Sequence, residues 1–257
     1  MTVNLIIDGS VAEIVLNDPS KLNALDDTAI GQLSAALSEA KDTEVRALLI
    51  RGEGRAFCAG RDISNVDTDT DDARGYLDDI VTPLLHQIAE FPAPTFAAAH
   101  GACLGVGLGL LIATDVVYVA DTAKIGSPFA NLGATLDSGG HALFFERLGA
   151  HRTLDLIYTA ELMTGAEAVA AGLFSRVVHE AELLDFTRER VERVATGATG
   201  AFLASKRLVA TLRDERIGLW NLLSAENAAQ GELGRSDDYR EGFAAFREKR
   251  RPTFSGT

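Results

Sequence analysis

The sequence contains only two cysteines, Cys58 and Cys103, and far fewer basic than acidic side chains. Two cysteines cannot build a disulfide framework or a zinc cluster, so we expect a protein of the reducing cytoplasm. The first four residues lack the basic stretch that opens a secretory signal, which agrees with this expectation. The formal net charge of −13 argues against binding to a phosphate backbone, and we expect no nucleic-acid partner.

Long apolar runs are scarce as well. The exception lies between Thr95 and Thr114, which approaches the length of a membrane span. Four glycines and His100 interrupt this run, and Pro92 and Pro94 precede it. Such a pattern is typical of a strand, a turn and a helix rather than of one continuous helix, so we expect no association with a membrane.

At 257 residues the chain can form one large domain, or one domain with an appendage. Strand-like and helix-like segments alternate up to about residue 180 and helices follow, which indicates an α/β core with a helical tail. We place the core at residues 1–195 and the C-terminal helical region at 196–257. Strands are expected at 3–7, 11–16, 46–51, 95–99, 116–120 and 175–178, and helices at 29–40, 83–90, 141–148, 164–172 and 237–249.

Two glycine-punctuated turns are the most informative feature. Each turn, at residues 56–62 and 100–109, follows a short apolar run and precedes a helix-like or loop segment. The first amides of a helix have no internal acceptor, so turns of this kind present bare N–H groups. Two such turns that meet at one point would form an oxyanion hole, in which each donor contributes about 3–4 kcal/mol to the stability of a developing enolate.

Other readings of these motifs fit less well. The glycines at 101, 105, 107 and 109 do not have the G-x-G-x-x-G spacing of a dinucleotide fold. The stretch 62–79 holds seven aspartates and resembles a calcium loop around Asp67, but Asp72 and Asp78 occupy the positions that require Gly and Glu. We therefore expect a solvated acidic loop there. The five histidines lack metal-ligand spacing, and we expect no metal site.

Five segments resemble the crotonase (enoyl-CoA hydratase/isomerase) superfamily, in order and across nearly the whole chain. They are residues 17–25, 56–63, the glycine-rich segment that ends at Asp115, 132–140, and the tail 241–250. The resemblance implies a spiral of ββα turns with a C-terminal helical region that trimerises. It further implies an acyl-CoA thioester as substrate, with coenzyme A as part of that substrate and no separate cofactor, and a homotrimer or a dimer of trimers as the assembly.

The resemblance also assigns the reacting groups. The oxyanion donors would be the backbone N–H groups of Arg61 and Val106. Family hydratases carry two glutamates, and here Gly109 and Phe129 stand in their places. One acid remains nearby, Asp137, where the isomerase branch, including ring 1,2-epoxyphenylacetyl-CoA isomerases, has an Asp. A single carboxylate suffices to shift a double bond, and an apolar acyl pocket lined by Phe129 and Leu136 would raise its pKa.

Several alternatives stay open for Asp137. It precedes a helix and could serve as its N-cap. A halobenzoyl-CoA dehalogenase has an Asp at the same offset, as a nucleophile. A Ser-His-Asp triad with Ser138 and His141 is disfavoured because no G-x-S-x-G elbow exists. The chain could instead hydrate enoyl-CoA with a non-standard acid, or bind acyl-CoA without catalysis.

For coenzyme A, the resemblance implies backbone around residues 23–25 and 59–63, with basic side chains for the phosphates. The implied residues are Lys21, Ala24, Ala59, Gly60, Asp62, Ile63 and Lys249, with Arg250 near the last of these. Lys249 could equally be an ordinary charged helix end. Phe246 would line the acyl pocket or pack in the trimer contact.

Overall fold

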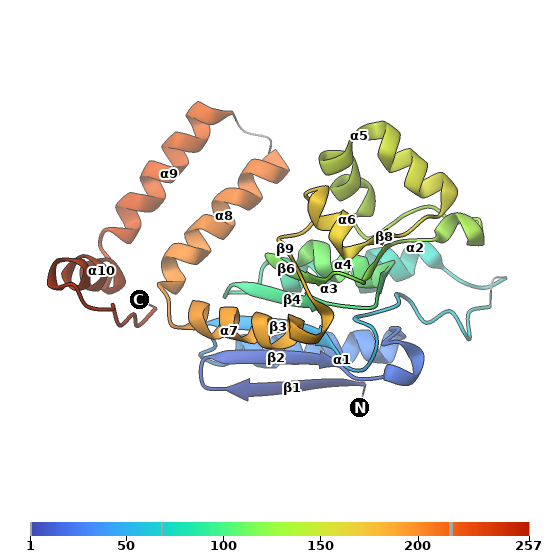
Figure 1. The fold of residues 1–257 in the computed structure, drawn as a ribbon, viewed down its shortest axis with the longest axis horizontal. Helices are drawn as coiled ribbons and strands as arrows, with labels where there is room; N and C mark the ends of the chain where they lie inside the picture. The colour runs from blue at the N-terminus through green and yellow to red at the C-terminus, as the bar shows by residue number, and fades with distance from the viewer. Residues whose placement is uncertain (1, 68, 216–217, 257) are drawn as a thin grey trace.

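A computed structural model describes residues 2–67, 69–215 and 218–256 and confirms an α/β core with a helical C-terminal part (Figure 1). The main sheet has the strand order β1-β2-β3-β4-β6-β9. Only β1 runs antiparallel to its neighbour; the other pairs are parallel. The strands are β1 (Val3–Asp8), β2 (Val11–Leu16), β3 (Ala47–Gly52), β4 (Thr95–Ala99), β6 (Val116–Ala120) and β9 (Arg176–Val178).

A second, three-stranded sheet was not predicted from the sequence. It consists of β5 (Ala102–Leu104), β7 (Lys124–Gly126) and β8 (Met163–Thr164), with β7 in the middle. Each of its strands has only two or three residues, which is too short for a periodic pattern to show. This sheet matters for the site, because β5 leads directly into the glycine-rich helix.

Two helices of the core begin at side-chain caps that the sequence offers. Helix α1 (Asp27–Lys41) starts at Asp26, whose side chain accepts a 2.8 Å hydrogen bond from the amide of Ala29. Helix α6 (Gly165–Ala170) starts with a complete capping box between Thr164 and Glu167. The remaining core helices are α2 (Ala73–Gly75), α3 (Thr82–Ala89), α4 (Val106–Ala113), α5 (Gly140–Thr159) and α7 (Leu183–Ala195).

Several short helical segments join these elements. They are the 3-10 turns η1 (Pro19–Lys21), η3 (Phe129–Leu132) and η4 (Glu180–Glu182), and the π-helix η2 (Tyr76–Val81). The predicted stop at Gly149 is wrong as a helix end. Gly149 leaves the helical conformation (φ 73°, ψ 172°), but the chain resumes as a helix up to Thr159. The glycine therefore kinks α5 instead of ending it.

The last three helices extend away from the sheets. Helices α8 (Thr199–Glu215) and α9 (Leu219–Leu233) form a hairpin, and α10 (Asp237–Glu248) lies at the far end of the molecule from α5 (Figure 1). Ser236 caps α10 by accepting from the amide of Tyr239 at 3.0 Å. The run 95–114 is divided among β4, β5 and α4. Within the described residues, no helix has both the length and the apolar character needed to cross a membrane.

Candidate active site

The two glycine turns lie against each other. Cys58 and Cys103 pair as an isolated parallel bridge. The amide of Cys58 donates to the carbonyl of Ala102 at 2.9 Å, and the amide of Leu104 donates to the carbonyl of Cys58 at 3.0 Å. Each turn therefore supplies a short piece of strand to the other, and the helix start at Val106 is fixed against the segment 58–61.

This close approach requires glycine at two positions. A Cβ atom on Gly60 would lie 2.9 Å from the carbonyl oxygen of Leu104 and 3.6 Å from the amide nitrogen of Val106. A Cβ atom on Gly107 would lie 2.4 Å from the carbonyl oxygen of Cys58. Both carbonyls belong to backbone, which cannot move aside as the tip of a side chain can. The glycines thus set the distance between the turns.

Both predicted oxyanion donors are free. Two hydrogen bonds hold the first turn: the amide of Leu25 donates to the carbonyl of Gly60 (2.8 Å), and the amide of Asp62 donates to the carbonyl of Leu25 (2.9 Å). The amide of Arg61, which lies between them, has no acceptor among the described residues. Val106 is the first residue of α4, where an amide has no intrahelical acceptor. Its N–H also lacks a partner among the described residues.

Asp137 lies half-buried in the loop that joins η3 to α5. Burial raises the pKa of Asp137, and a hydrogen bond from Ser138 and the charge of His141 oppose this rise. The N-cap alternative is wrong. The N-cap of α5 is Gly139, and no side chain caps this helix, so the Asp137 carboxylate is not engaged by the helix start. Among the described residues, its one hydrogen bond comes from the Ser138 hydroxyl, at 2.8 Å.

The loop that carries Asp137 packs on α4 at Gly109, and Phe129 of η3 packs at the start of the same helix. A Cβ atom on Gly109 would lie 2.6 Å from the Cβ atom of Ser138. The ring of Phe129 lies 3.0 Å from where a Cβ atom of Gly105 would be. Leu136 is buried beside Asp137. The structure therefore gathers Phe129, Leu136 and Asp137 around the first turns of α4.

Most of the residues implied for coenzyme A also meet. Lys21 pairs with Asp62 at 2.7 Å, which holds the pKa of Asp62 well below its usual range and raises that of Lys21. The amide of Ala59 donates to the carbonyl of Leu22 at 3.0 Å, so the segment 21–24 packs on 59–62. Ala24, Gly60 and Ile63 belong to the same two segments, and the Ile63 side chain is 54% exposed.

Asn23 is a structural residue of this region that the sequence argument missed. Its side-chain amide donates to the carbonyls of Glu53 (2.9 Å) and Ala56 (2.7 Å), and its oxygen accepts from the amide of Asp18 at 2.8 Å. The backbone of Asn23 has a positive φ of 56°, which asparagine tolerates better than most residues. These bonds hold the segment 18–25 against the first glycine turn.

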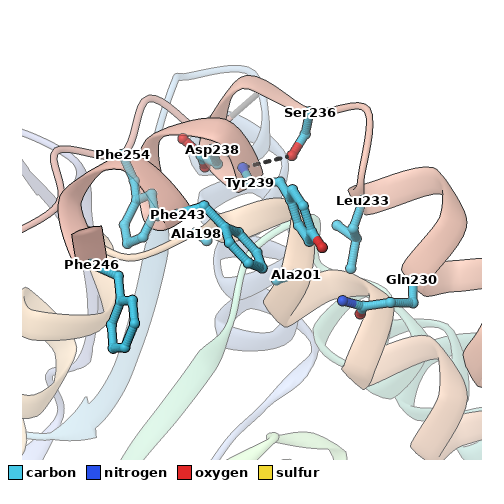
Figure 2. A pocket seen from close by; sticks show the side chains of 12 residues that line it. Ala198, Ala201, Gln230, Leu233, Ser236, Asp238, Tyr239, Phe243, Phe246 and Phe254 are labelled. Carbon is cyan, nitrogen blue, oxygen red and sulfur yellow. Dashed lines mark hydrogen bonds between the residues drawn. The ribbon is translucent and has the colours of Figure 1, made fainter.

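Within one chain, Phe246 and Lys249 do not lie near the other predicted site residues. Helix α10, which carries Phe246 and ends at Lys249, lies at the opposite end of the core from η1 and η3 (Figure 1). Phe246 is 83% exposed and lines a groove of about 460 Å³ between α8, α9 and α10, with Phe243, Tyr239 and Phe254 (Figure 2). Lys249 is the exposed C-cap of α10, which fits an ordinary helix end.

The side chain of Arg61 adds a feature that the sequence argument did not foresee. Arg61 pairs with Asp71 at 2.6 Å, and its guanidinium lies 3.9 Å over the ring of Tyr76. Part of the acidic stretch is thereby tied to the first glycine turn instead of being freely solvated. Among the described residues, no group of three or more His, Cys, Asp or Glu side chains is placed to hold a metal ion. Thr68 of the calcium-like stretch lies outside the described residues.

Comparison with known proteins agrees with this arrangement. A protein named "Probable enoyl-CoA hydratase" from Rhodobacter capsulatus is 35% identical, over 99% of this chain and 98% of its own. The 1,2-epoxyphenylacetyl-CoA isomerase of Escherichia coli is 30% identical over 97% of both chains. A crystal structure of an enoyl-CoA hydratase from Bacillus anthracis superimposes with a TM-score of 0.91 at 25% identity, covering 100% of both chains.

These matches confirm the crotonase fold that the resemblance implied. The family model described as enoyl-CoA hydratase/isomerase matches residues 7–257, which is nearly the whole chain. The names of the relatives include both hydratases and an isomerase, so they identify the family and not the reaction. The chain belongs to the enoyl-CoA hydratase/isomerase family.

Proposed function

We propose that this acyl-CoA enzyme shifts a carbon–carbon double bond of an enoyl-CoA, with Asp137 as the group that carries the proton. One observation carries the proposal. Asp137 lies in the loop whose Ser138 packs against Gly109 of α4, while Gly109 and Phe129 occupy the positions that the resemblance gives to the two hydratase glutamates. Hydration needs one group to activate water and a second to manage the proton at the α-carbon, whereas a double-bond shift needs one.

The reaction proceeds in two proton transfers. The Asp137 carboxylate removes a proton from C2 of a 3-enoyl-CoA, and the C–H electron pair passes into the thioester to give a dienolate. The N–H groups of Arg61 and Val106 donate to the enolate oxygen. Asp137 then returns its proton to C4, the electrons move back, and the double bond lies between C2 and C3. No atom is gained or lost.

The environment of Asp137 suits this role. A base removes protons better as its pKa approaches the working pH, and burial raises the pKa of Asp137. The Ser138 hydroxyl holds the carboxylate in one orientation. Both C2 and C4 lie in the plane of the dienolate, so the same carboxylate can reach both carbons from one face of it.

The remaining parts of the proposal concern binding and assembly. The segments 21–24 and 59–63 hold coenzyme A as part of the substrate, and no separate cofactor takes part. The exposed Phe246 and the apolar groove around it favour assembly of copies through α8–α10, as a homotrimer or a dimer of trimers. Phe246 and Lys249 could then reach an active site only in a neighbouring copy.

The test is turnover of 3-enoyl-CoA and of 2-enoyl-CoA by the wild type, Asp137→Asn and the control Asp8→Asn, which removes an exposed carboxylate of β1. We expect the wild type and the control to isomerise 3-enoyl-CoA, and Asp137→Asn to lose the activity by 100-fold or more while it still binds acyl-CoA. Hydration of 2-enoyl-CoA that survives in Asp137→Asn would favour a hydratase with another acid. Binding without any turnover would favour a non-catalytic acyl-CoA-binding protein.

A further inference from the structure

Tyr76 presents a buried hydroxyl that no part of the described chain uses. The side chain is only 7% exposed, and its oxygen has no hydrogen-bond partner among the described residues. A buried hydroxyl without a partner costs folding free energy, and nearly all such groups in proteins are paired. An orphaned hydroxyl that the fold retains therefore indicates a partner outside the chain.

The backbone around Tyr76 is unusual in a second way. Tyr76 opens the six-residue π-helix η2, which runs directly into α3. π-helical turns are rare and occur frequently at functional sites, because the extra residue in the turn re-aims the side chains of that segment. Tyr76 is buried at the start of this segment, whereas residues 71–74 before it are exposed.

The ring of Tyr76 lies against the side chain of the first glycine turn's Arg61. The Arg61 guanidinium lies over its ring at 3.9 Å. Burial raises the pKa of Tyr76; the charge of Arg61 lowers it, and those of Asp27, Cys58 and Asp137 raise it further. Three of these four neighbours belong to the first glycine turn or to the proposed base. The hydroxyl keeps its proton throughout the neutral range, so it acts as a hydrogen-bond donor.

We propose that Tyr76 is a specificity-determining residue, whose hydroxyl donates a hydrogen bond to an oxygen atom of the acyl group beyond the thioester carbonyl. This inference rests on the proposed function of the site as an acyl-CoA site. The preferred substrates are then acyl-CoA thioesters whose acyl group carries a hydroxyl, keto or ether oxygen.

The other possible acceptors for the Tyr76 hydroxyl already have donors or lie in other parts of the site. The thioester oxygen has the backbone donors of Arg61 and Val106, and the Asp137 carboxylate accepts from Ser138. The coenzyme A segments meet at the more exposed pair of Lys21 and Asp62, whereas the Tyr76 hydroxyl is buried. Because the hydroxyl is closed off from solvent, an acyl group reaches it only if the side chains around it rearrange on binding.

The experiment measures binding without turnover. Titration calorimetry in the Asp137→Asn background compares butanoyl-CoA with 3-hydroxybutanoyl-CoA and 4-hydroxybutanoyl-CoA. We expect at least one hydroxyacyl thioester to bind about fivefold to tenfold more tightly than butanoyl-CoA. Adding Tyr76→Phe removes this preference. The hydroxyacyl thioester then binds more weakly, while the affinity for butanoyl-CoA is unchanged.

A matched control and a folding check accompany the comparison. Tyr118→Phe removes the hydroxyl of another buried tyrosine, which packs on Phe186 away from the site, and it leaves the preference unchanged. Tyr76→Phe also melts at a higher temperature than its parent, because it removes a buried group without a partner.

Four outcomes overturn the inference. If no hydroxyacyl thioester binds more tightly than butanoyl-CoA, or if the preference survives Tyr76→Phe, the inference fails while the proposed function stands. Equal weakening of all three thioesters by Tyr76→Phe would mean that the residue only supports the fold. If none of the thioesters binds to either protein, the proposed acyl-CoA site fails, and the inference fails with it.

Discussion

The hydroxyl of Ser138 donates a 2.8 Å hydrogen bond to Oδ1 of Asp137 from a backbone with a positive φ of 51°. This left-handed conformation is uncommon for residues other than glycine, asparagine and aspartate, and it costs free energy wherever it occurs. The strain is retained at the one place where it aims a donor at the proposed base. The hydrogen bond stabilises the ionised carboxylate, against the burial that raises its pKa.

Ser138→Ala should therefore change the pH dependence of isomerisation. Without the hydroxyl, the pKa of Asp137 rises further, so the protonated, inactive form persists to higher pH. We expect the acid limb of the kcat/KM profile to move to higher pH. Ser138→Gly removes the same hydroxyl and also relieves the strain, so it should show the same shift. A profile that does not move in either variant contradicts a role for this hydrogen bond.

Gly109 and Ser138 should behave as a coupled pair. A Cβ atom on Gly109 would lie 2.6 Å from that of Ser138, so Gly109→Ala must displace the loop that holds Asp137. We expect Gly109→Ala to lower both the activity and the melting temperature. In the Ser138→Gly background, Gly109→Ala should lower the activity and the melting temperature clearly less, because the Cβ atom of Ser138 is gone. Purely additive losses in the four proteins of this cycle would contradict the contact.

The sequence predicted the parts of the fold that local chemistry controls. The predicted helices at 29–40, 164–172 and 237–249 form, and Asp26, Thr164 and Ser236 cap them, because a capping side chain bonds to amides only two or three residues away. Five strands of the main sheet have five or six residues, which is long enough for an apolar run to show, while β9 has only three. The sheet of β5, β7 and β8 was missed, since its short strands are paired by contacts that are distant along the chain.

The candidate site was predictable only in part, for the same reason. The glycine turns are recognisable from composition, and the hypothesis that they converge was stated, but the bridge between Cys58 and Cys103 that joins them was not predicted. The Tyr76 hydroxyl and the Arg61–Asp71 pair could not be foreseen, because they depend on how the acidic stretch folds back onto the first turn. The roles of the site residues, and the division at residue 195, stay predictions.

Asp137→Asn should stabilise the protein at neutral pH. Burial raises the pKa of Asp137 in the folded protein above the value of about 3.9 that it has in the unfolded chain. The contribution of this carboxyl to folding stability is therefore complete below about pH 3.9, and it is lost as the pH rises through the folded pKa. Ionised Asp137 is therefore a cost at pH 7, which the asparagine avoids. We expect the variant to melt about 1–3 °C higher than the wild type at pH 7, and this gain to vanish near pH 4. A variant that melts lower at pH 7 would show that the carboxylate stabilises the fold.

Phe246→Ser should weaken the proposed assembly. The ring is 83% exposed beside an apolar groove, which is a costly arrangement for an isolated chain and a favourable one for a contact between copies. We expect a wild-type trimer or hexamer in sedimentation velocity and a shift toward smaller species for Phe246→Ser. Ile6→Ser, which changes an exposed apolar residue of the edge strand β1, serves as the control and should sediment as the wild type does. Identical sedimentation of Phe246→Ser and wild type would contradict an interface at this groove.

The central claim is that Asp137 moves a proton at the α-carbon of a thioester held by two backbone donors. The most direct test converts a 3-enoyl-CoA in deuterated water and follows its C2 and C4 hydrogens by NMR, with wild type and Asp137→Asn. We predict that the wild type rapidly removes a C2 hydrogen, which returns at C4 or is replaced by deuterium, at a rate at least 100-fold above that of Asp137→Asn, with acyl-CoA affinity unchanged. Equal rates for both proteins, or binding by the wild type with neither transfer nor exchange, would contradict the claim.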